Sequence, residues 1–234
     1  MQALWDLKEC PPTFDFACFL VCAATLGAKS VHFRNEGEIQ TKKFGAEIAW
    51  NRFRNITLPL CELMGMDHTM GPGGEGITPA YHLGTVEALY QRVGKICKFP
   101  LIDGPRGYVT VTLRQSFRNE HRNSSPAWEP FIEELEKRTN VIVLPECELN
   151  SLPLETRMRL YSNADMNYGV NNGPMILCVL SDAPYKIFKV ITNKEAREHH
   201  RKTGFPEGMQ CGWRNDKQAF IYEDDTLEVL NRYR

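Results

Sequence analysis

Residues 164–180 read ADMNYGVNNGPMILCVL, and this stretch decides the fold class. Its first part, 164–168, has the length of a strand, and Asn-Asn-Gly-Pro at 171–174 is typical of a turn that ends a strand and begins a helix. The residues that follow are apolar on every side, as expected for a helix buried against a sheet. A strand joined by a tight turn to a buried helix is the repeating unit of α/β proteins with parallel sheets.

The same alternation of strands and helices continues on both sides of this stretch. In the second half we predict strands at 108–113, 141–144, 164–168 and 185–191, and helices at 128–138, 154–163, from 171 onward and at the end of 220–234. In the first half we predict strands at 3–7 and 30–34, a loop at 66–76, and helices at 13–27, at 42–64 and from 78 onward. The pattern breaks at 98–107, so we expect two domains, 1–105 and 106–234, the second with doubly wound order.

Composition limits the classes of partner. The 234 residues carry a formal net charge of −1, which gives no general attraction to nucleic acid or to an anionic membrane. No apolar run reaches the roughly 20 residues that a membrane span requires. The 8 cysteines include no Cys-x-x-Cys pair, so we expect reduced thiols, a cytoplasmic location, and neither a disulfide framework nor a zinc site.

Side chains that bind anions follow the predicted strand at 108–113. Arg114 and Gln115 come directly after it, and Arg118 and Arg122 lie a few residues further on. Guanidinium groups form paired hydrogen bonds with phosphate oxygens, and ligands of parallel sheets bind at the carboxyl ends of the strands. The segment therefore predicts a diphosphate clamp, with a solvated basic loop as the alternative.

The turn Asn171-Asn172-Gly173-Pro174 is the second candidate. We expect an asparagine to cap the following helix, Gly173 to let a ligand approach the backbone, and Pro174 to occupy the first helical position. The unpaired N–H groups at the start of that helix would then favour an anion. The alternative is an ordinary capped helix start.

Two further residues are candidates for the same ligand. Glu146 follows the strand at 141–144, where a carboxylate could accept hydrogen bonds from sugar hydroxyls, or it belongs to an acidic surface loop. Arg157 either faces the ligand or pairs with Glu155 and Glu133.

The Gly-rich run at 71–76 matches no established phosphate motif. It lacks the Gly-Lys-Ser/Thr of a Walker loop, and we expect no strand before it, which argues against a dinucleotide fingerprint. A mobile loop that carries Glu75 toward an acceptor and a plain surface loop both remain open. No Asp-x-Asp motif is present.

The stretch 108–191 resembles the donor-binding half of glycosyltransferases with two Rossmann-like domains, of the heptosyltransferase kind. The resemblance rests on Thr112-Leu113-Arg114 and on Asn172-Gly173-Pro174. The segments 6–16 and 218–225 are similar to those of bacterial surface-polysaccharide proteins of this type. The chain is short for that fold.

The resemblance implies an α/β fold of two small Rossmann-like halves, GT-B-like, facing a cleft. It also implies transfer of a sugar from a nucleotide-sugar donor to a saccharide acceptor, with no metal or other cofactor, and a carboxylate or histidine as base. Asp15, His68 and Glu75 are the candidate bases. A sugar-nucleotide epimerase or hydrolase, and a binding protein without catalysis, are the alternatives.

Overall fold

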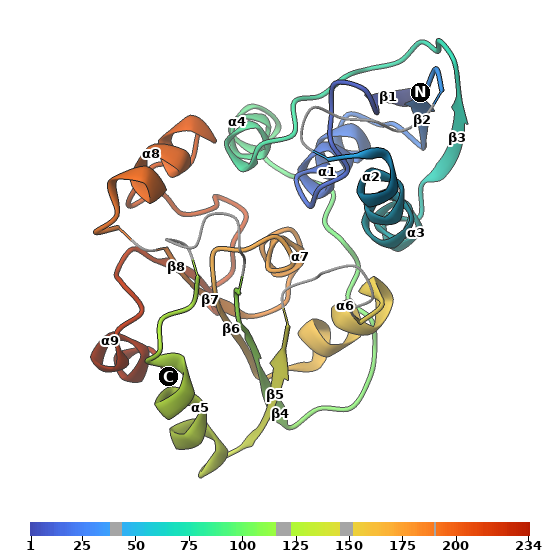
Figure 1. Cartoon of the computed structure of the whole chain (residues 1–234). Helices are drawn as coiled ribbons and strands as arrows, with labels where there is room; N and C mark the ends of the chain where they lie inside the picture. Colours follow the sequence, from blue (N-terminus) through green and yellow to red (C-terminus); the bar gives the residue numbers. More distant parts are fainter. Residues whose placement is uncertain (38–43, 116–122, 146–151, 190) are drawn as a thin grey trace. The chain divides into compact units, whose positions relative to one another are not determined.

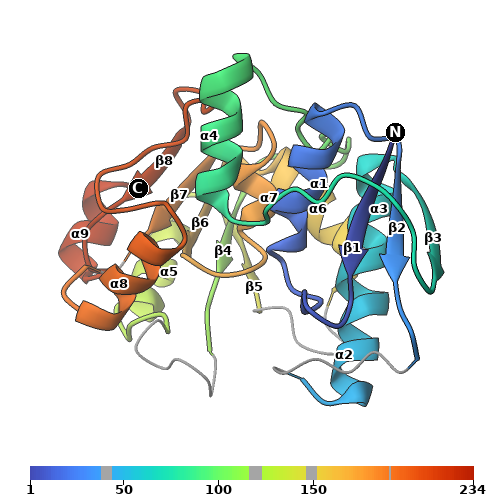
Figure 2. The same cartoon turned by 90° about the horizontal axis from the view of Figure 1, so that it is seen from above.

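The computed structural model describes residues 1–37, 44–115, 123–145, 152–189 and 191–234. By their internal contacts the residues form two units, Met1–Pro100 with Leu152–Glu155, and Leu101–Ser151 with Thr156–Arg234. The main change from one unit to the other falls inside the 98–107 stretch. Each unit contains a wholly parallel sheet (Figures 1 and 2), so the prediction of an α/β protein with two parallel-sheet halves is confirmed.

The first sheet has three strands, β1 (Gln2–Asp6), β2 (Ser30–Arg34) and β3 (Asp67–Gly71), side by side in that order. Trp5 and Phe33 are register partners and therefore lie on the same face. Trp5 packs edge-on against Phe16 and Phe19 at 4.8 Å between ring centroids, and Phe33 packs against Phe53 at 4.9 Å. This aromatic cluster attaches the helices to one face of the sheet, as right-handed crossovers between successive strands require.

The helices of this unit are α1 (Phe16–Thr25), α2 (Ala46–Arg52), the π-helical turn η1 (Phe53–Thr57), α3 (Leu58–Met64) and α4 (Leu83–Val93). The single helix predicted for 42–64 is thus interrupted by η1. Pro59, in the first turn of α3, has no N–H and crowds the carbonyl four residues earlier, which accounts for the wider turn before it.

The loop predicted for 66–76 is partly wrong, because 67–71 is the edge strand β3. From β3 the chain passes to the opposite edge of the sheet, where Ile77 pairs with Ala3. Gly74 lies against the ring of His32 on the way, and Arg34 donates to the carbonyls of Gly73 and Gly74 at 3.1 and 3.3 Å. The next helix begins at Leu83 and not at 78.

The second sheet has five strands in the order β5-β4-β6-β7-β8. They are β4 (Tyr108–Thr112), β5 (Asn140–Leu144), β6 (Met166–Val170), β7 (Tyr185–Phe188) and β8 (Gln218–Ile221). In chain order this is 2-1-3-4-5, a doubly wound arrangement in which the chain reverses direction between β4 and β6. The helices are α5 (Trp128–Glu136), α6 (Leu154–Asn163), α7 (Ile176–Val179), α8 (Lys194–Lys202) and α9 (Leu227–Arg232).

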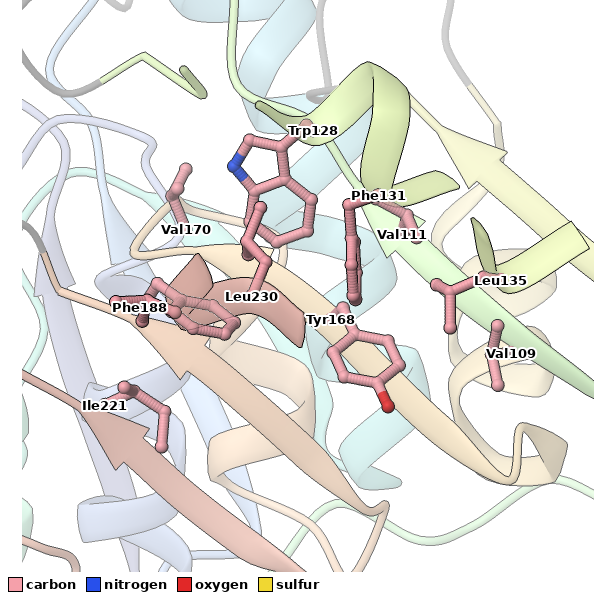
Figure 3. Packing of buried hydrophobic residues seen from close by; sticks show 11 residues of the cluster. Val109, Val111, Trp128, Phe131, Leu135, Tyr168, Val170, Phe188, Ile221 and Leu230 are labelled. Carbon is pink, nitrogen blue, oxygen red and sulfur yellow. The ribbon is translucent and has the colours of Figure 1, made fainter. Parts of the chain in front are cut away.

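One face of this sheet is covered by α5 and α9. Figure 3 shows Trp128, Phe131 and Leu135 gathered over inward side chains of the strands. The buried cluster consists of Val109, Val111, Trp128, Phe131, Leu135, Tyr168, Val170, Phe188, Ile221, Val229 and Leu230. Apolar contact on this scale holds the sheet rigid, so its strand ends have fixed positions.

Candidate functional site

The reversal of chain direction between β4 and β6 brings the predicted donor residues to one place. Arg114 lies two residues beyond the end of β4, and Asn171 to Gly173 follow the end of β6, its neighbour in the sheet. Such a reversal opens a crevice at the carboxyl ends of two adjacent strands, where ligands of doubly wound proteins bind.

Arg114 is held against the protein at this edge. Its side chain is largely buried, and its backbone N–H donates to the Ser124 hydroxyl at 2.9 Å while its carbonyl accepts from the Ser124 N–H at 3.0 Å. Gln115, next in the chain, is exposed. Arg118, Arg122 and Glu146 lie outside the described residues.

Residues 171–174 do not begin the long helix that was predicted. Helix α7 has four residues and its N-cap is Met175, so neither Asn171 nor Asn172 is the N-cap, and Pro174 precedes the helix. The N–H groups at the helix start all have acceptors: Met175 donates to Asn172 Oδ1, Ile176 to Gly173 O, Leu177 to Pro174 O and Cys178 to Met175 O. The helix start therefore offers no free N–H group from Met175 to Cys178, and an anion site at this turn stays a prediction.

Two backbone donors without an acceptor in the described part of the chain lie one step earlier in the turn. The Asn171 N–H donates to Phe188 O at 3.0 Å, but the N–H groups of Asn172 and Gly173 have no acceptor among the described residues. Asn172 is only 7% exposed. Backbone donors in such a place normally bond to water or to a ligand.

Gly169 allows the two strands and the turn to pack closely. A Cβ atom at this position would lie 3.0 Å from the Thr112 carbonyl oxygen and 3.3 Å from Met175 Sδ. The side chain of Asn172 also reaches Thr112, with Nδ2 3.5 Å from the carbonyl oxygen. The end of β4 and the turn after β6 thus form one packed unit.

Arg157 lies beneath the carboxyl ends of β4 and β5. The side chain is 0% exposed, and its two terminal nitrogens donate to the Tyr161 hydroxyl at 3.2 Å and to the Pro145 carbonyl at 2.8 Å. Within the described ranges it forms no ion pair, so the proposed pairing with Glu155 and Glu133 is not observed there.

The three candidate bases lie apart within the first unit. Asp15 precedes α1, at the carboxyl end of the sheet, and accepts from the Thr13 hydroxyl at 3.0 Å. His68 is the second residue of β3 and therefore lies near the opposite end of the strands. Glu75 precedes Gly76, whose Cβ position is 2.7 Å from the carbonyl of Gln2, at the start of β1. All three side chains are exposed, and they do not form a cluster.

Lys189 is a buried cation that was not among the predicted site residues. It directly follows β7, is 2% exposed, and holds its ammonium 4.4 Å from the ring centroid of Phe220 and 4.6 Å from that of Phe205. Alternation along Tyr185, Ile187 and Lys189 puts it on an inward face, and that alternation was the available signal.

Neither a metal site nor a membrane span is found in the described part of the chain. No three His, Cys, Asp or Glu side chains there are placed to hold a metal ion. No helix in those ranges is long and apolar enough to cross a membrane.

Comparisons with known proteins relate the chain to a solved structure. No protein-family model and no curated protein matches the chain. The crystal structure of the bacterial iron-containing dodecameric glycosyltransferase TibC from enterotoxigenic E. coli H10407 is similar, with a TM-score of 0.49 and 10% identity. The match covers 94% of this chain, which spans 63% of the length of that one.

Proposed function

We propose that the chain binds a nucleotide sugar at the carboxyl edge of the second sheet and transfers the sugar to a saccharide acceptor without a metal ion. The observation that carries the proposal is that the N–H groups of Asn172 and Gly173 have no acceptor among the described residues, at the β4–β6 reversal that also holds Arg114. Backbone donors and a guanidinium at the same edge of a sheet suit the oxygens of a diphosphate.

The chemistry follows from that arrangement. When the sugar leaves, negative charge grows on the diphosphate, and fixed donors that face it lower the barrier. A base must accept the proton of the acceptor hydroxyl. The candidates for this role are Asp15, His68 and Glu75, all exposed side chains of the first unit. We place the reaction in cytoplasmic polysaccharide synthesis.

The exposure of all three candidate bases favours a second function, nucleotide-sugar binding without catalysis. A binding protein needs the anion site of the second unit and no base in the first. Binding of the ligand is common to both functions, and turnover separates them.

The test is a thermal-shift screen with UDP-, GDP-, CMP- and ADP-sugars, followed by a product assay with any sugar nucleotide that binds. A ligand at 100 times its Kd adds about 2.7 kcal/mol to the free energy of unfolding, enough for a clear rise in Tm. Release of the nucleoside phosphate only when a saccharide acceptor is present supports transfer. Release without an acceptor indicates a hydrolase, an altered sugar on an intact nucleotide indicates an epimerase, and binding without any product indicates the binding protein. A protein that binds none of the sugar nucleotides contradicts the proposal.

A further inference from the structure

A chain of buried hydrogen bonds links the ends of two strands at the proposed ligand edge. Thr112, the last residue of β4, shares a hydrogen bond of 2.8 Å with the Tyr161 hydroxyl. Arg157, one helical turn before Tyr161 on α6, donates to the same hydroxyl and also to the carbonyl of Pro145, just after β5. One arginine thus fixes the carboxyl ends of β4 and β5 relative to each other.

Tyr161 is held in its neutral form. Burial raises the pKa of its hydroxyl to about 12. The neutral hydroxyl can donate its proton to the Thr112 hydroxyl while it accepts a hydrogen bond from Arg157. The position of Arg157 is thereby coupled through Tyr161 to the end of β4.

The charge of Arg157 is unusual for its position. The guanidinium is fully buried, its Nε has no hydrogen-bond partner, and no described carboxylate pairs with it. Burying an unpaired charge is unfavourable, so such a charge is seldom kept for stability alone. In a poorly screened interior it raises the positive potential of the strand ends above it.

We propose that Arg157 and Tyr161 are a positioning pair for a bound diphosphate, in which the hydrogen bonds fix the strand ends and the buried charge makes the edge prefer the more negative of two phosphate ligands. The inference rests on the proposed function, because it concerns the same edge. It differs from the prediction that Arg157 contacts the ligand, since a side chain with no exposed surface acts through Tyr161, Thr112 and its field.

The experiment is isothermal titration calorimetry of the full chain with inorganic pyrophosphate and with inorganic phosphate. Neither probe carries a nucleoside, so the experiment does not depend on which nucleotide the protein binds. Three variants are compared with the wild type: Arg157→Met, Tyr161→Phe and Arg159→Met. Arg159 is two residues further along the same helix and exposed, so its variant is the matched control for the loss of one positive charge. Melting temperatures are recorded for all four proteins.

We expect Arg157→Met to weaken pyrophosphate binding about tenfold and phosphate binding less, so that the preference between them shrinks. Tyr161→Phe keeps the charge, so it should lower the affinities for pyrophosphate and for phosphate by the same small factor and leave the preference between them unchanged. Arg159→Met should change neither affinity by more than about twofold, since an exposed charge is screened.

A folded Arg157→Met protein with wild-type preference overturns the inference. Where Arg157→Met does not fold, Arg157→Lys replaces it: the charge stays and the two-directional hydrogen bonding is lost, so the preference should survive, and its loss overturns the inference. A wild type that binds sugar nucleotides but not pyrophosphate also overturns it, whereas a wild type that binds neither contradicts the proposed function itself.

Discussion

The indole Nε1 of Trp128 donates to Oδ2 of Asp225 at 2.5 Å, across 97 residues of chain. The same carboxylate oxygen accepts from the backbone N–H of Ser125 at 2.8 Å. Asp225 precedes α9 and Trp128 begins α5, so this carboxylate joins the two helices that cover one face of the second sheet. The two acidic residues 224 and 225 therefore have structural roles, since Asp224 accepts from the N–H groups of Ile191 and Thr192.

Asp225→Ala should lower the free energy of unfolding by about 2–4 kcal/mol, because it leaves the buried Trp128 Nε1–H and the half-buried Ser125 N–H without an acceptor. Urea denaturation followed by tryptophan fluorescence measures the change. Asp224→Ala is the control: its carboxylate is less buried, water can replace it, and the loss should be about 1 kcal/mol. Equal losses for the two variants would show that burial of the Trp128 contact is not the cause.

The parts of the fold that follow a hydrophobic pattern could be predicted. The strand Ser30–Arg34 and the helix Leu154–Asn163 have the predicted bounds, because alternation and helical spacing of apolar residues mark them. The strand Asp67–Gly71 was missed because four of its five side chains are exposed, so no apolar alternation marks it. Helix Lys194–Lys202 was missed for a similar reason, since it buries only Ala196 and His200.

The location of the site at the ends of strands could be predicted from the sequence, but the identity of its hydrogen-bond donors could not. Arg114 and Asn171–Gly173 follow strands, and the strand order brings them together. Which N–H groups remain available depends on the turn: Asn172 Oδ1 binds the Met175 N–H, and the helix behind it is only four residues long. Neither fact has a signature in the sequence.

Gly74→Ala should destabilise the first unit more than Gly73→Ala. Both glycines have positive φ, +98° and +71°, which is unfavourable for alanine by roughly 1 kcal/mol. A Cβ at 74 would in addition lie 2.4 Å from Cδ2 of His32, whereas a Cβ at 73 would meet no atom within 4 Å. The measurement is the difference in Tm between the two variants, and His32→Ala in the Gly74→Ala background should remove most of it.

Stability should fall at alkaline pH through Tyr168. Burial raises the pKa of its hydroxyl from 10.0 to about 12, so the folded state keeps a proton that the unfolded state loses above pH 10. The contribution is complete below pH 10 and is lost as the pH rises to about 12. Between pH 9 and pH 11, the free energy of unfolding measured in urea titrations should fall by about 1–2 kcal/mol less for Tyr168→Phe than for the wild type. Parallel curves for the two proteins would mean that the hydroxyl already ionises near its usual pKa.

Arg114→Ala should weaken sugar-nucleotide binding ten- to a hundredfold, which corresponds to the loss of about 1.5–3 kcal/mol from charge-assisted hydrogen bonds. Titration calorimetry with the sugar nucleotide found in the screen gives the affinity. Ser124→Ala is the control, because it removes the hydroxyl that accepts from the Arg114 N–H and keeps the guanidinium. If Ser124→Ala and Arg114→Ala weaken binding equally, the side chain of Arg114 orders the loop and does not contact the ligand.

The last prediction separates ligand binding from stability at the turn after β6. Gly173→Val adds bulk beside the N–H groups of Asn172 and Gly173, and if these bind the diphosphate, the variant should lose at least a hundredfold in affinity while remaining folded. Asn172→Ala should behave in the opposite way, since it removes the acceptor of the buried Met175 N–H and should lower stability by about 1–2 kcal/mol with a smaller effect on affinity. Melting temperature and affinity are measured side by side for the two variants. Asn171→Ala, which does not cap the helix, should leave stability closer to that of the wild type than Asn172→Ala does. Normal affinity in a folded Gly173→Val protein would show that these backbone donors do not bind the ligand, and the proposal of a bound diphosphate would lose its main support.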